Sequence, residues 1–312
     1  MNFLVRLASV AIITCAIFTL LGMGGSYYVW LDLFSHFRLQ YFLLSIGCLI
    51  IFLAALHYRQ ITVAFITAVV NFFFLLPYYG AETAGGAPPD IRLMLLNVKS
   101  ENRQYEQVLG ELERLQPDVF VVQELNRFWV RQLAEVGPEY PYQLLREQQG
   151  HFGIGIYSRY PLSDKQIIDF VDRSWPSVLA TVQMPMGQEV LLLATHPVPP
   201  LSQPMFQSRN RQLYEVGDYV ARQQKPAVVL GDFNCSQFSP VFAQTFGDLP
   251  LRDTQLDTGL QPSWPVWGPL FMVTLDHVLV SPHWQTVARF TGNDIGSDHL
   301  PVFISLRLAT AR

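Results

Sequence analysis

The chain of 312 residues contains only three cysteines, and their positions exclude two kinds of protein. Cys15 and Cys48 lie in long apolar runs, and Cys235 is the only cysteine in the rest of the chain. A lone cysteine cannot form a disulfide within that part, and no cysteine–histidine group has the spacing of a zinc site. The chain is therefore neither a disulfide scaffold nor a thiolate-bound zinc protein.

Charge is scarce in the first 80 positions. Of the 46 charged residues in the chain, four fall there: Arg6, Asp32, Arg38 and Arg59. Apolar runs fill most of the same part, at residues 3–23, 41–56 and 61–79. A membrane-spanning helix needs about 20 apolar residues, with roughly 17 to 25 the usual range. We therefore predict that residues 1–80 form a membrane anchor with about three transmembrane helices.

A signal peptide, a soluble helix or an ion channel accounts less well for these apolar runs. A cleaved signal peptide would produce the first run but not the next two. A buried soluble helix would produce any single run but not three in succession. An ion-conducting role for the helices has no support, because the runs contain no acidic residue.

Basic residues beside the runs favour one orientation. Arg6 and Arg59 favour a cytoplasmic amino-terminal tail and second turn, whereas Arg38 in the first loop, partly offset by Asp32, argues for the reverse. Three spans then place the carboxy-terminal part outside the cytoplasm. We expect a multi-pass protein of a bacterial inner membrane, with that part in the periplasm.

A small, Gly- and Pro-rich stretch, residues 81–90, is typical of a linker, and a second domain is predicted at 91–312. From residue 81 onward the chain has 18 lysines and arginines against 24 aspartates and glutamates, a net charge of −6, without a basic cluster. Tight nucleic-acid binders neutralise phosphates with a basic surface. The composition therefore counts against a processive nuclease and leaves a metal-assisted one open.

Short apolar runs that end in polar residues dominate the second domain. They predict strands at 92–98, 119–123, 154–158, 178–183, 189–194, 227–230, 274–280 and 302–307. Helical spacing of apolar residues predicts helices at 106–115 and 211–222. Strands with a few interspersed helices indicate an α/β or α+β sandwich of layers.

Polar side chains gather where these predicted strands end. After the run VVLG, alternation along an extended chain would direct Asp232 and Asn234 to one side and Phe233 to the other. Other strand ends carry Asn97, Gln123-Glu124, His196, Asp276-His277 and Ser297-Asp298-His299. Turn formation explains any one of these ends. Six together, rich in carboxylates and imidazoles, predict one functional rim.

The segments that carry these residues resemble the endonuclease/exonuclease/phosphatase superfamily, which includes DNase I-like nucleases, inositol-polyphosphate 5-phosphatases and neutral sphingomyelinases. The matching segments, in the order of the family, are LLNV, VVQE, ATH, GDFN, LDHVLVS and SDH, within about residues 91–307. The resemblance implies a four-layered α/β (α+β) sandwich, with two mixed β-sheets flanked by helices. It also implies Mg²⁺-dependent phosphoester hydrolysis at the strand ends.

The resemblance further implies a role for each residue. The metal, Mg²⁺ or alternatively Mn²⁺, would be held by Glu124, Asn97 and Asp298. His299, oriented by Asp276, would activate water, and His196 would supply charge or a proton. Asp232 and Asn234 would position the nucleophile and a phosphate oxygen. Oxygen ligands of this kind are what Mg²⁺ prefers.

Several further residues have two readings. Relatives place substrate contacts near Arg209 and His151, whereas a solvated helix and a surface loop are the alternatives. His277 should face away from Asp276 and is not expected to be catalytic. Thr274 stands where many relatives carry a basic residue. Trp264 and Trp267 would either line the pocket or pack elsewhere.

The leading hypothesis is a membrane-anchored, Mg²⁺-dependent phosphodiesterase or phosphatase. Its phosphoester substrate would be a lipid headgroup, a small phosphodiester or a nucleic acid, and no protein partner is evident. An endonuclease or exonuclease acting on DNA or RNA is the alternative within the same chemistry. A non-catalytic binding module that retains the fold is the alternative of another class.

Overall fold

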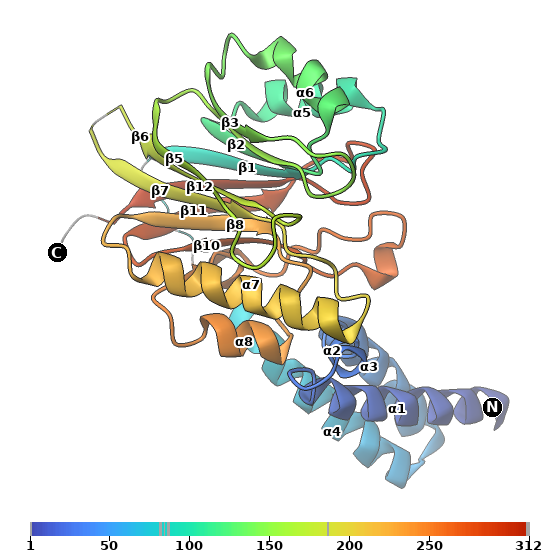
Figure 1. Ribbon diagram of the computed structural model, residues 1–312. Coiled ribbons are helices and arrows are strands. Elements are labelled where there is room, and N and C mark those ends of the chain that lie inside the picture. The colour runs from blue at the N-terminus through green and yellow to red at the C-terminus, as the bar shows by residue number, and fades with distance from the viewer. Residues whose placement is uncertain (1, 81–82, 84, 86–87, 186, 310–312) are drawn as a thin grey trace.

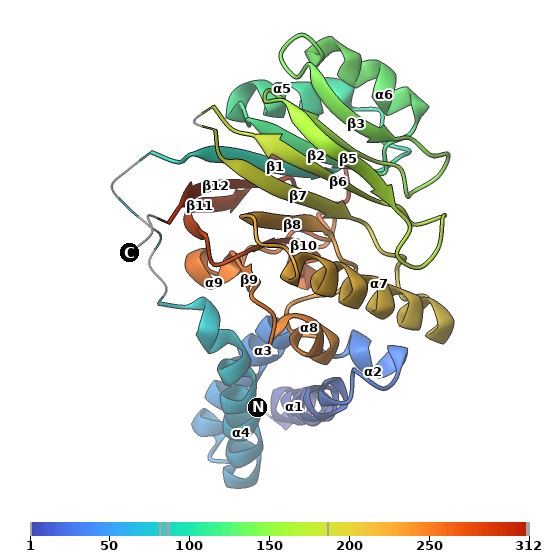
Figure 2. The ribbon, with the colours of Figure 1, turned by 60° about the vertical axis from the view of Figure 1, so that its left-hand side comes forward.

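The computed structural model describes residues 2–80, 83, 85, 88–185 and 187–309. Half of the predicted linker at 81–90, residues 81–82, 84 and 86–87, lies outside the described residues. Figures 1 and 2 show two packed parts: a bundle of amino-terminal helices and a layered sandwich of sheets and helices.

The amino-terminal bundle contains three long apolar helices: α1 (Asn2–Met23), α3 (Arg38–Ala55) and α4 (Tyr58–Leu75). Each is long and apolar enough to cross a membrane, as predicted. The second helix begins at Arg38, three residues before the predicted run. A short helix, α2 (Val29–Leu33), lies in the connection between α1 and α3, and η1 (Leu76–Tyr78) follows α4. We call residues 24–37 the α1–α3 connection.

Two six-stranded mixed sheets form the centre of the sandwich, as predicted. The first has the order β11-β12-β1-β2-β4-β3, in which β1 and β2 are parallel. Its strands are β1 (Ile91–Asn97), β2 (Val119–Gln123), β3 (Tyr142–Arg146), β4 (Ile154–Ser158), β11 (Trp284–Thr291) and β12 (Val302–Leu308). The second has the order β5-β6-β7-β8-β10-β9, in which β7 and β8 are parallel. Its strands are β5 (Leu162–Ile168), β6 (Ser177–Gln183), β7 (Glu189–Thr195), β8 (Ala227–Asp232), β9 (Arg252–Asp253) and β10 (Asp276–Val280).

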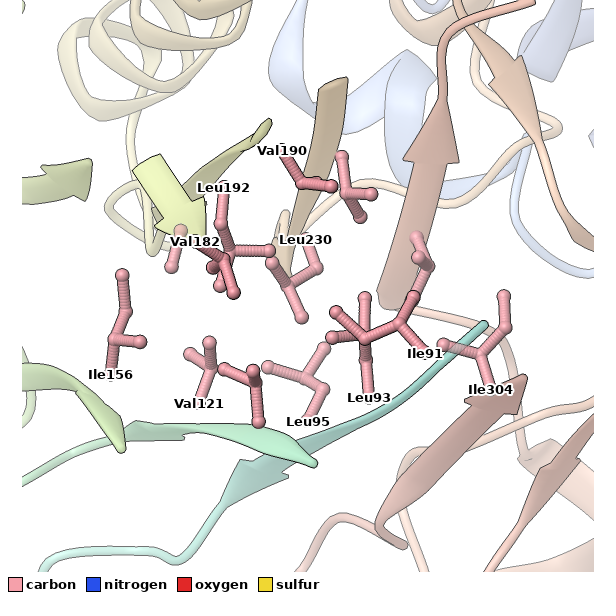
Figure 3. Close-up of a cluster of buried hydrophobic side chains, with 14 of the residues drawn as sticks. Ile91, Leu93, Leu95, Val121, Ile156, Val182, Val190, Leu192, Leu230 and Ile304 are labelled. Atoms are coloured by element: carbon pink, nitrogen blue, oxygen red, sulfur yellow. The ribbon is translucent and has the colours of Figure 1, made fainter. Parts of the chain in front are cut away.

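Alternate residues of the two sheets meet in a shared apolar core. Leu93, Leu95 and Val121 of the first sheet face Leu192 and Leu230 of the second (Figure 3). All five side chains are buried, which fixes how the two sheets stack and therefore where their ends lie.

Helices cover the outer faces of both sheets. On the first sheet lie α5 (Tyr105–Leu115) and α6 (Arg127–Leu133), followed by η2 (Ala134–Val136). On the second lie α7 (Gln203–Ala221) and α8 (Pro240–Phe246). The short elements α9 (Gln255–Thr258) and η3 (Pro269–Phe271) lie between β9 and β10. The prediction for α7 began eight residues too late, because Ser202 caps the helix by accepting a hydrogen bond from the Met205 backbone N–H.

Several strands and short helices of the sandwich were not predicted. The missed strands β3 and β5 are edge strands with few buried side chains, so their sequences lack a continuous apolar run. Strand β9 has only two residues. Strand β11 is interrupted by a bulge between Thr286 and Ala288, which breaks the alternation that predicts a strand. The missed helices α6 and α8 have seven residues each, too few for a clear helical period.

Candidate active site

Strand pairing brings the predicted polar ends of both sheets together. Asn97 pairs with Gln123 in the first sheet, and Asp232 pairs with Asp276 in the second. The buried side chain of Gln123 joins the two sheets, since it accepts a hydrogen bond from the Asp232 backbone N–H (2.8 Å) and donates one to the Thr195 carbonyl (2.7 Å). Gln123 belongs to the VVQE segment but was not predicted to bridge the sheets.

Gly231 permits this close approach. A Cβ atom there would lie 1.9 Å from the Thr195 carbonyl oxygen and 2.8 Å from Nε2 of Gln123. Any larger residue would push β8 away from β7 and from the glutamine bridge. The glycine of the GDFN segment therefore sets the position of Asp232.

The Asp232 carboxylate is the meeting point of the site. Its Oδ2 lies 3.5 Å from Nε2 of His196 and 3.5 Å from Nε2 of His299. The same oxygen accepts a hydrogen bond from Asn97 Nδ2 (3.3 Å). Burial alone would raise the pKa of Asp232, but attraction to His299 and His196 lowers it to about 2. The carboxylate is therefore ionised and holds two imidazoles at one point.

His299 is oriented by Asp276, as the resemblance implied. Its Nδ1 lies 2.8 Å from Oδ2 of Asp276, which leaves Nε2 directed toward Asp232. Burial lowers the pKa of His299, but the carboxylates of Asp276 and Asp232 outweigh burial and raise it to about 9. The Arg289 guanidinium donates to the Asp276 backbone carbonyl (3.0 Å) and helps to hold this strand end.

Glu124 lies on the other side of the pocket in a polar cluster. Its Oε2 accepts hydrogen bonds from the Ser100 backbone N–H (3.0 Å) and hydroxyl (3.2 Å) and lies 2.9 Å from His151 Nδ1. The hydrogen bond to Glu124 raises the pKa of His151 despite partial burial. Ligand atoms of Glu101, Glu124 and His151 lie within 4.8 Å of one another, so the group is able to hold a metal ion. Glu101 was not predicted, because no motif marks it.

The other two predicted metal ligands have partners of their own. Asp298 lines the same pocket as Glu124, and its Oδ2 lies 3.8 Å from Lys99 Nζ. Asn97 accepts a hydrogen bond from the Lys99 backbone N–H while it donates to Asp232. Two carboxylates that line one pocket, with a carboxamide beside them, match the oxygen-rich donor set of Mg²⁺.

The pocket has a volume of about 540 Å³ and collects most of the predicted site residues. These are Glu124, His151, His196, Asp232, Asn234, Asp298 and His299, with Trp264 beside them. Four further lining residues come from the α1–α3 connection: Trp30, Leu33, His36 and Phe37. Sequence reasoning missed these four, because they lie in the predicted anchor and reach the pocket only through tertiary packing.

Arg209 lies neither at the substrate pocket nor on a solvated helix face, the two positions predicted for it. Its side chain is fully buried, and the pocket lining does not include it. The guanidinium donates to Asp32 Oδ2 (2.8 Å) in the α1–α3 connection and to the Asn234 backbone carbonyl (2.7 Å). The prediction of a substrate contact was wrong, as was that of a solvated helix face, since the partner of Arg209 lies 177 positions away in the sequence.

The chain after Asp232 does not stay extended as far as Asn234. Strand β8 ends at Asp232, and Asn234 has a left-handed backbone conformation (φ 49°). Asn234 still lines the pocket, and its Nδ2 donates to the Pro197 carbonyl (3.0 Å). Phe233 points away and stacks on His277, which is buried against Asp253 (2.9 Å). His277 thus lies on the opposite face, as expected.

The structure also places Trp267 and Thr274, whose roles the sequence left open. Trp267 is 76% exposed and does not line the pocket, unlike Trp264. Thr274 is buried and donates to Gln255 Oε1 (3.0 Å), so the position that is basic in many relatives makes an internal contact here.

Comparison with known proteins agrees with this geometry. The model of the Endonuclease/Exonuclease/phosphatase family matches residues 94–299. No match was found among curated proteins. Similar solved structures include a humanized TDP2 of D. rerio with 14 mutations (TM-score 0.61, 18% identity), which covers 70% of this chain and 98% of that one.

Two other solved structures show the same fold. The catalytic domain of human Nocturnin has a TM-score of 0.59 at 17% identity and covers 75% of this chain and 98% of its own. A mannosyl-6-phosphatase of Bacteroides thetaiotaomicron has a TM-score of 0.55 at 15% identity and covers 69% and 99%. The family model, matched over most of the second domain, shows that this chain is a member of the endonuclease/exonuclease/phosphatase family.

Proposed function

We propose that the chain is a membrane-anchored, Mg²⁺-dependent phosphoester hydrolase. The family consists of phosphoester hydrolases, and its structural neighbours include a mannosyl-6-phosphatase and a TDP2 complexed with a single-strand DNA product. The observation that carries the proposal is the Asp276–His299–Asp232–His196 chain of contacts in a pocket that Glu124 and Asp298 also line. Such a constellation supplies the groups that ester hydrolysis needs.

Glu124, Asp298 and Asn97 would hold the metal, with Mg²⁺ the first choice and Mn²⁺ the alternative. When bound, the cation supplies positive charge to the phosphate oxygens and lowers the pKa of nearby acids. The oxygen-rich donor set supports this assignment.

The chain's own residues would divide the remaining work. His299, held by Asp276, would take a proton from the attacking water at Nε2 when its imidazole is neutral, a form that becomes more populated as the pH rises toward its pKa of about 9. The water oxygen bonds to phosphorus as one P–O ester bond breaks. His196 would return a proton to the leaving oxygen. Asp232 would keep both imidazoles in place, and Asn234 and His151 would contact the phosphate.

The anchor is proposed to hold the catalytic domain outside the cytoplasm, in the periplasm of a bacterial cell. Support comes from Arg38, whose side chain is fully buried and donates to the Thr19 carbonyl (3.0 Å) within the helix bundle. Arg38 thus faces the interior of the helix bundle, and the basic residues left in the tail and the second turn, Arg6 and Arg59, favour this orientation.

The proposal is tested by hydrolysis of bis(p-nitrophenyl) phosphate with the full-length protein in detergent, in Mg²⁺ or in EDTA. We expect release of p-nitrophenol that needs both the metal and His299. The matched control is His283→Ala, because His283 is exposed and does not line the pocket. Metal-dependent hydrolysis that survives His299→Ala would refute the assigned roles.

A nuclease in the narrow sense is the alternative, because one structural neighbour is D. rerio TDP2 complexed with a single-strand DNA product. Nicking of supercoiled plasmid under the same conditions distinguishes it. The net charge of −6 from residue 81 onward leads us to expect weak nicking. A folded, Mg²⁺-binding protein without any hydrolysis would favour the non-catalytic binding module.

A further inference from the structure

The α1–α3 connection is built into the catalytic domain. Asp32 is buried and accepts hydrogen bonds from Arg209 (2.8 Å) and from the Ser239 hydroxyl (2.5 Å). His36 Nδ1 lies 2.7 Å from the Ser236 hydroxyl. Val29 belongs to the apolar cluster under α7 and α8. These contacts join the α1–α3 connection to the second sheet's helical layer, and Figure 1 shows α2 beside α7.

Glycine makes this docking possible at one position. A Cβ atom on Gly25 would lie 2.9 Å from Asp32 Cα and 3.1 Å from the ring of Pro240 in α8. The connection thus packs against α8 more closely than a chain with a side chain at this position would permit. The contact surface is specific to the sequence on both sides.

The active-site pocket is amphipathic. Its floor carries the histidines and carboxylates described above, whereas Trp30, Leu33 and Phe37 form an apolar wall contributed by the connection. Trp30 is 56% exposed and Leu33 38% exposed, so this wall is open to a ligand. A small hydrophilic phosphoester would leave the wall uncovered.

A second hollow continues the apolar wall along the membrane helices. It has a volume of about 510 Å³ and shares Leu33 and Phe37 with the active-site pocket. Its sides are residues of α1 and α3, among them Thr14, Phe18 and Leu44. Both helices are long and apolar enough to cross a membrane. We call this hollow the α1/α3 groove.

The distance along α1 from the far end of the groove to the end of the helix is close to the thickness of one membrane leaflet. The groove reaches Ala11, twelve residues from the end of α1 at Met23, and a rise of 1.5 Å per residue makes this about 18 Å. Half of a hydrocarbon core of roughly 30 Å is about 15 Å. If α1 crosses a bilayer, the Ala11 end of the groove would lie close to the middle of that bilayer.

Aromatic and apolar side chains around the groove also fit a membrane surface. Tyr27 and Tyr28 are exposed where α1 ends. Leu270 and Phe271 of η3 are exposed, and Phe271 lines the groove. The Gln40 side chain donates to the Met272 carbonyl (2.9 Å), which keeps this segment beside α3. Exposed tyrosines just beyond the end of an apolar helix are typical of the membrane–water interface.

From these observations we propose that the substrate is a membrane phospholipid whose phosphate lies on the pocket floor and whose acyl chain lies in the α1/α3 groove. The inference rests on the proposed function and names its substrate class. It explains why an apolar hollow between α1 and α3 adjoins the histidine-lined pocket at Leu33 and Phe37. The reaction is the hydrolysis already described, with a lipid carrying the phosphoester.

Groove-filling variants test the proposal in the full-length protein. Thr14→Trp places an indole in the groove. Ile13→Trp is the matched control, because Ile13 is exposed on the same helix and does not line the groove. Each protein is assayed in Mg²⁺ on nanodiscs with phosphatidylglycerol, phosphatidylethanolamine, phosphatidylcholine and phosphatidate carrying palmitoyl chains. Parallel assays use bis(p-nitrophenyl) phosphate and the same four headgroups with hexanoyl chains.

We expect Thr14→Trp to lower the ratio of palmitoyl-lipid to p-nitrophenyl ester turnover at least tenfold, and Ile13→Trp to leave it within twofold. Native mass spectrometry in EDTA supplies a readout without turnover: wild type and Ile13→Trp should retain a bound phospholipid that Thr14→Trp loses. An unchanged ratio and unchanged binding in Thr14→Trp would overturn the groove assignment.

The remaining outcomes separate the two proposals. Turnover of the p-nitrophenyl ester without turnover of any palmitoyl lipid would overturn the lipid substrate and leave the proposed hydrolase intact. Turnover of neither, by folded wild type in Mg²⁺, would remove both.

Discussion

Two buried carboxylates, Asp32 in the α1–α3 connection and Asp232 at the end of β8, have different partners. Asp32 accepts hydrogen bonds from the Arg209 guanidinium at 2.8 Å and from the Ser239 hydroxyl at 2.5 Å. Asp232 contacts two imidazoles at 3.5 Å, and its residue lines the pocket. The first arrangement is suited to joining the amino-terminal helices to the sandwich, and the second to the proton transfers that we propose.

The largest expected effect comes from breaking the second arrangement. His299→Ala removes the group that we propose takes the proton from water, and general-base contributions are about 10²- to 10⁴-fold. We expect Mg²⁺-dependent ester turnover to fall by that factor while the fold is retained. The measurement is kcat with the p-nitrophenyl ester, together with the midpoint of thermal unfolding. A fall of less than threefold would contradict the role of His299.

Breaking the first arrangement should affect stability instead. Asp32→Asn leaves the buried Arg209 guanidinium without a charged partner, which costs about 3–5 kcal/mol in comparable pairs. We expect a lower free energy of unfolding and faster maleimide labelling of Cys235, which lies buried beneath this contact and whose thiol pKa burial raises to about 11. Peptide mapping separates Cys235 from Cys15 and Cys48.

The control for Asp32→Asn is an exposed ion pair. Glu189 and Lys225 are paired on the surface, where solvent screens the attraction and the pair contributes little to stability. Glu189→Gln should therefore leave both the unfolding midpoint and the labelling of Cys235 close to wild type. Equal effects of the two substitutions would mean that Asp32 does not hold the connection in place.

Metal affinity distinguishes two donor sets near Glu124. We expect Glu124→Gln and Asp298→Asn each to weaken Mg²⁺ binding at least about tenfold in calorimetric titration, and exposed Glu113→Gln to leave it unchanged. Glu101→Gln sharpens the comparison. If it weakens binding more than Asp298→Asn, the ion is held by the Glu101–Glu124–His151 group instead.

The smallest expected effect is a pH dependence of the docked α1–α3 connection. Burial lowers the pKa of His36 to about 4. The positive charges of Arg209 and Arg38 also lower it, whereas the negative charge of Asp32 raises it. An undocked His36 would bind a proton near pH 6.5, so docking loses stability as the pH falls from about 6.5 through about 4. His36→Gln should flatten the dependence of the unfolding midpoint on pH in this window. An unchanged slope would contradict the assignment.

The surroundings of Asp232 could be predicted from the sequence, whereas those of Asp32 could not. Asp232, His299 and Glu124 follow or precede strands whose apolar runs are continuous, so the position of each polar end could be predicted from the adjoining run. The Asp32–Arg209 pair could not be predicted, since each residue belongs to a local pattern that has its own explanation. Their contact depends on how the anchor packs against the domain, which no local periodicity records.

Edge elements account for most of the remaining differences. Strands β3 and β5 keep their polar residues exposed at the sheet edges, and their formation depends on pairing with β4 and β6. Helix α7 began earlier than predicted because its cap, Ser202, precedes the apolar period. In each case tertiary or capping contacts, and not local periodicity, decided where the element begins.

The most direct test measures Asp232→Asn and Asp32→Asn side by side, since the two substitutions are chemically identical. For each variant, kcat with the p-nitrophenyl ester and the free energy of unfolding are determined under the same conditions. We predict that Asp232→Asn loses at least a hundredfold in kcat and less stability than Asp32→Asn, because His299 keeps its contact with Asp276. Asp32→Asn should lose stability by about 3 kcal/mol or more and less than tenfold in kcat. Full activity in Asp232→Asn would contradict the assignment of this pocket as a hydrolytic site.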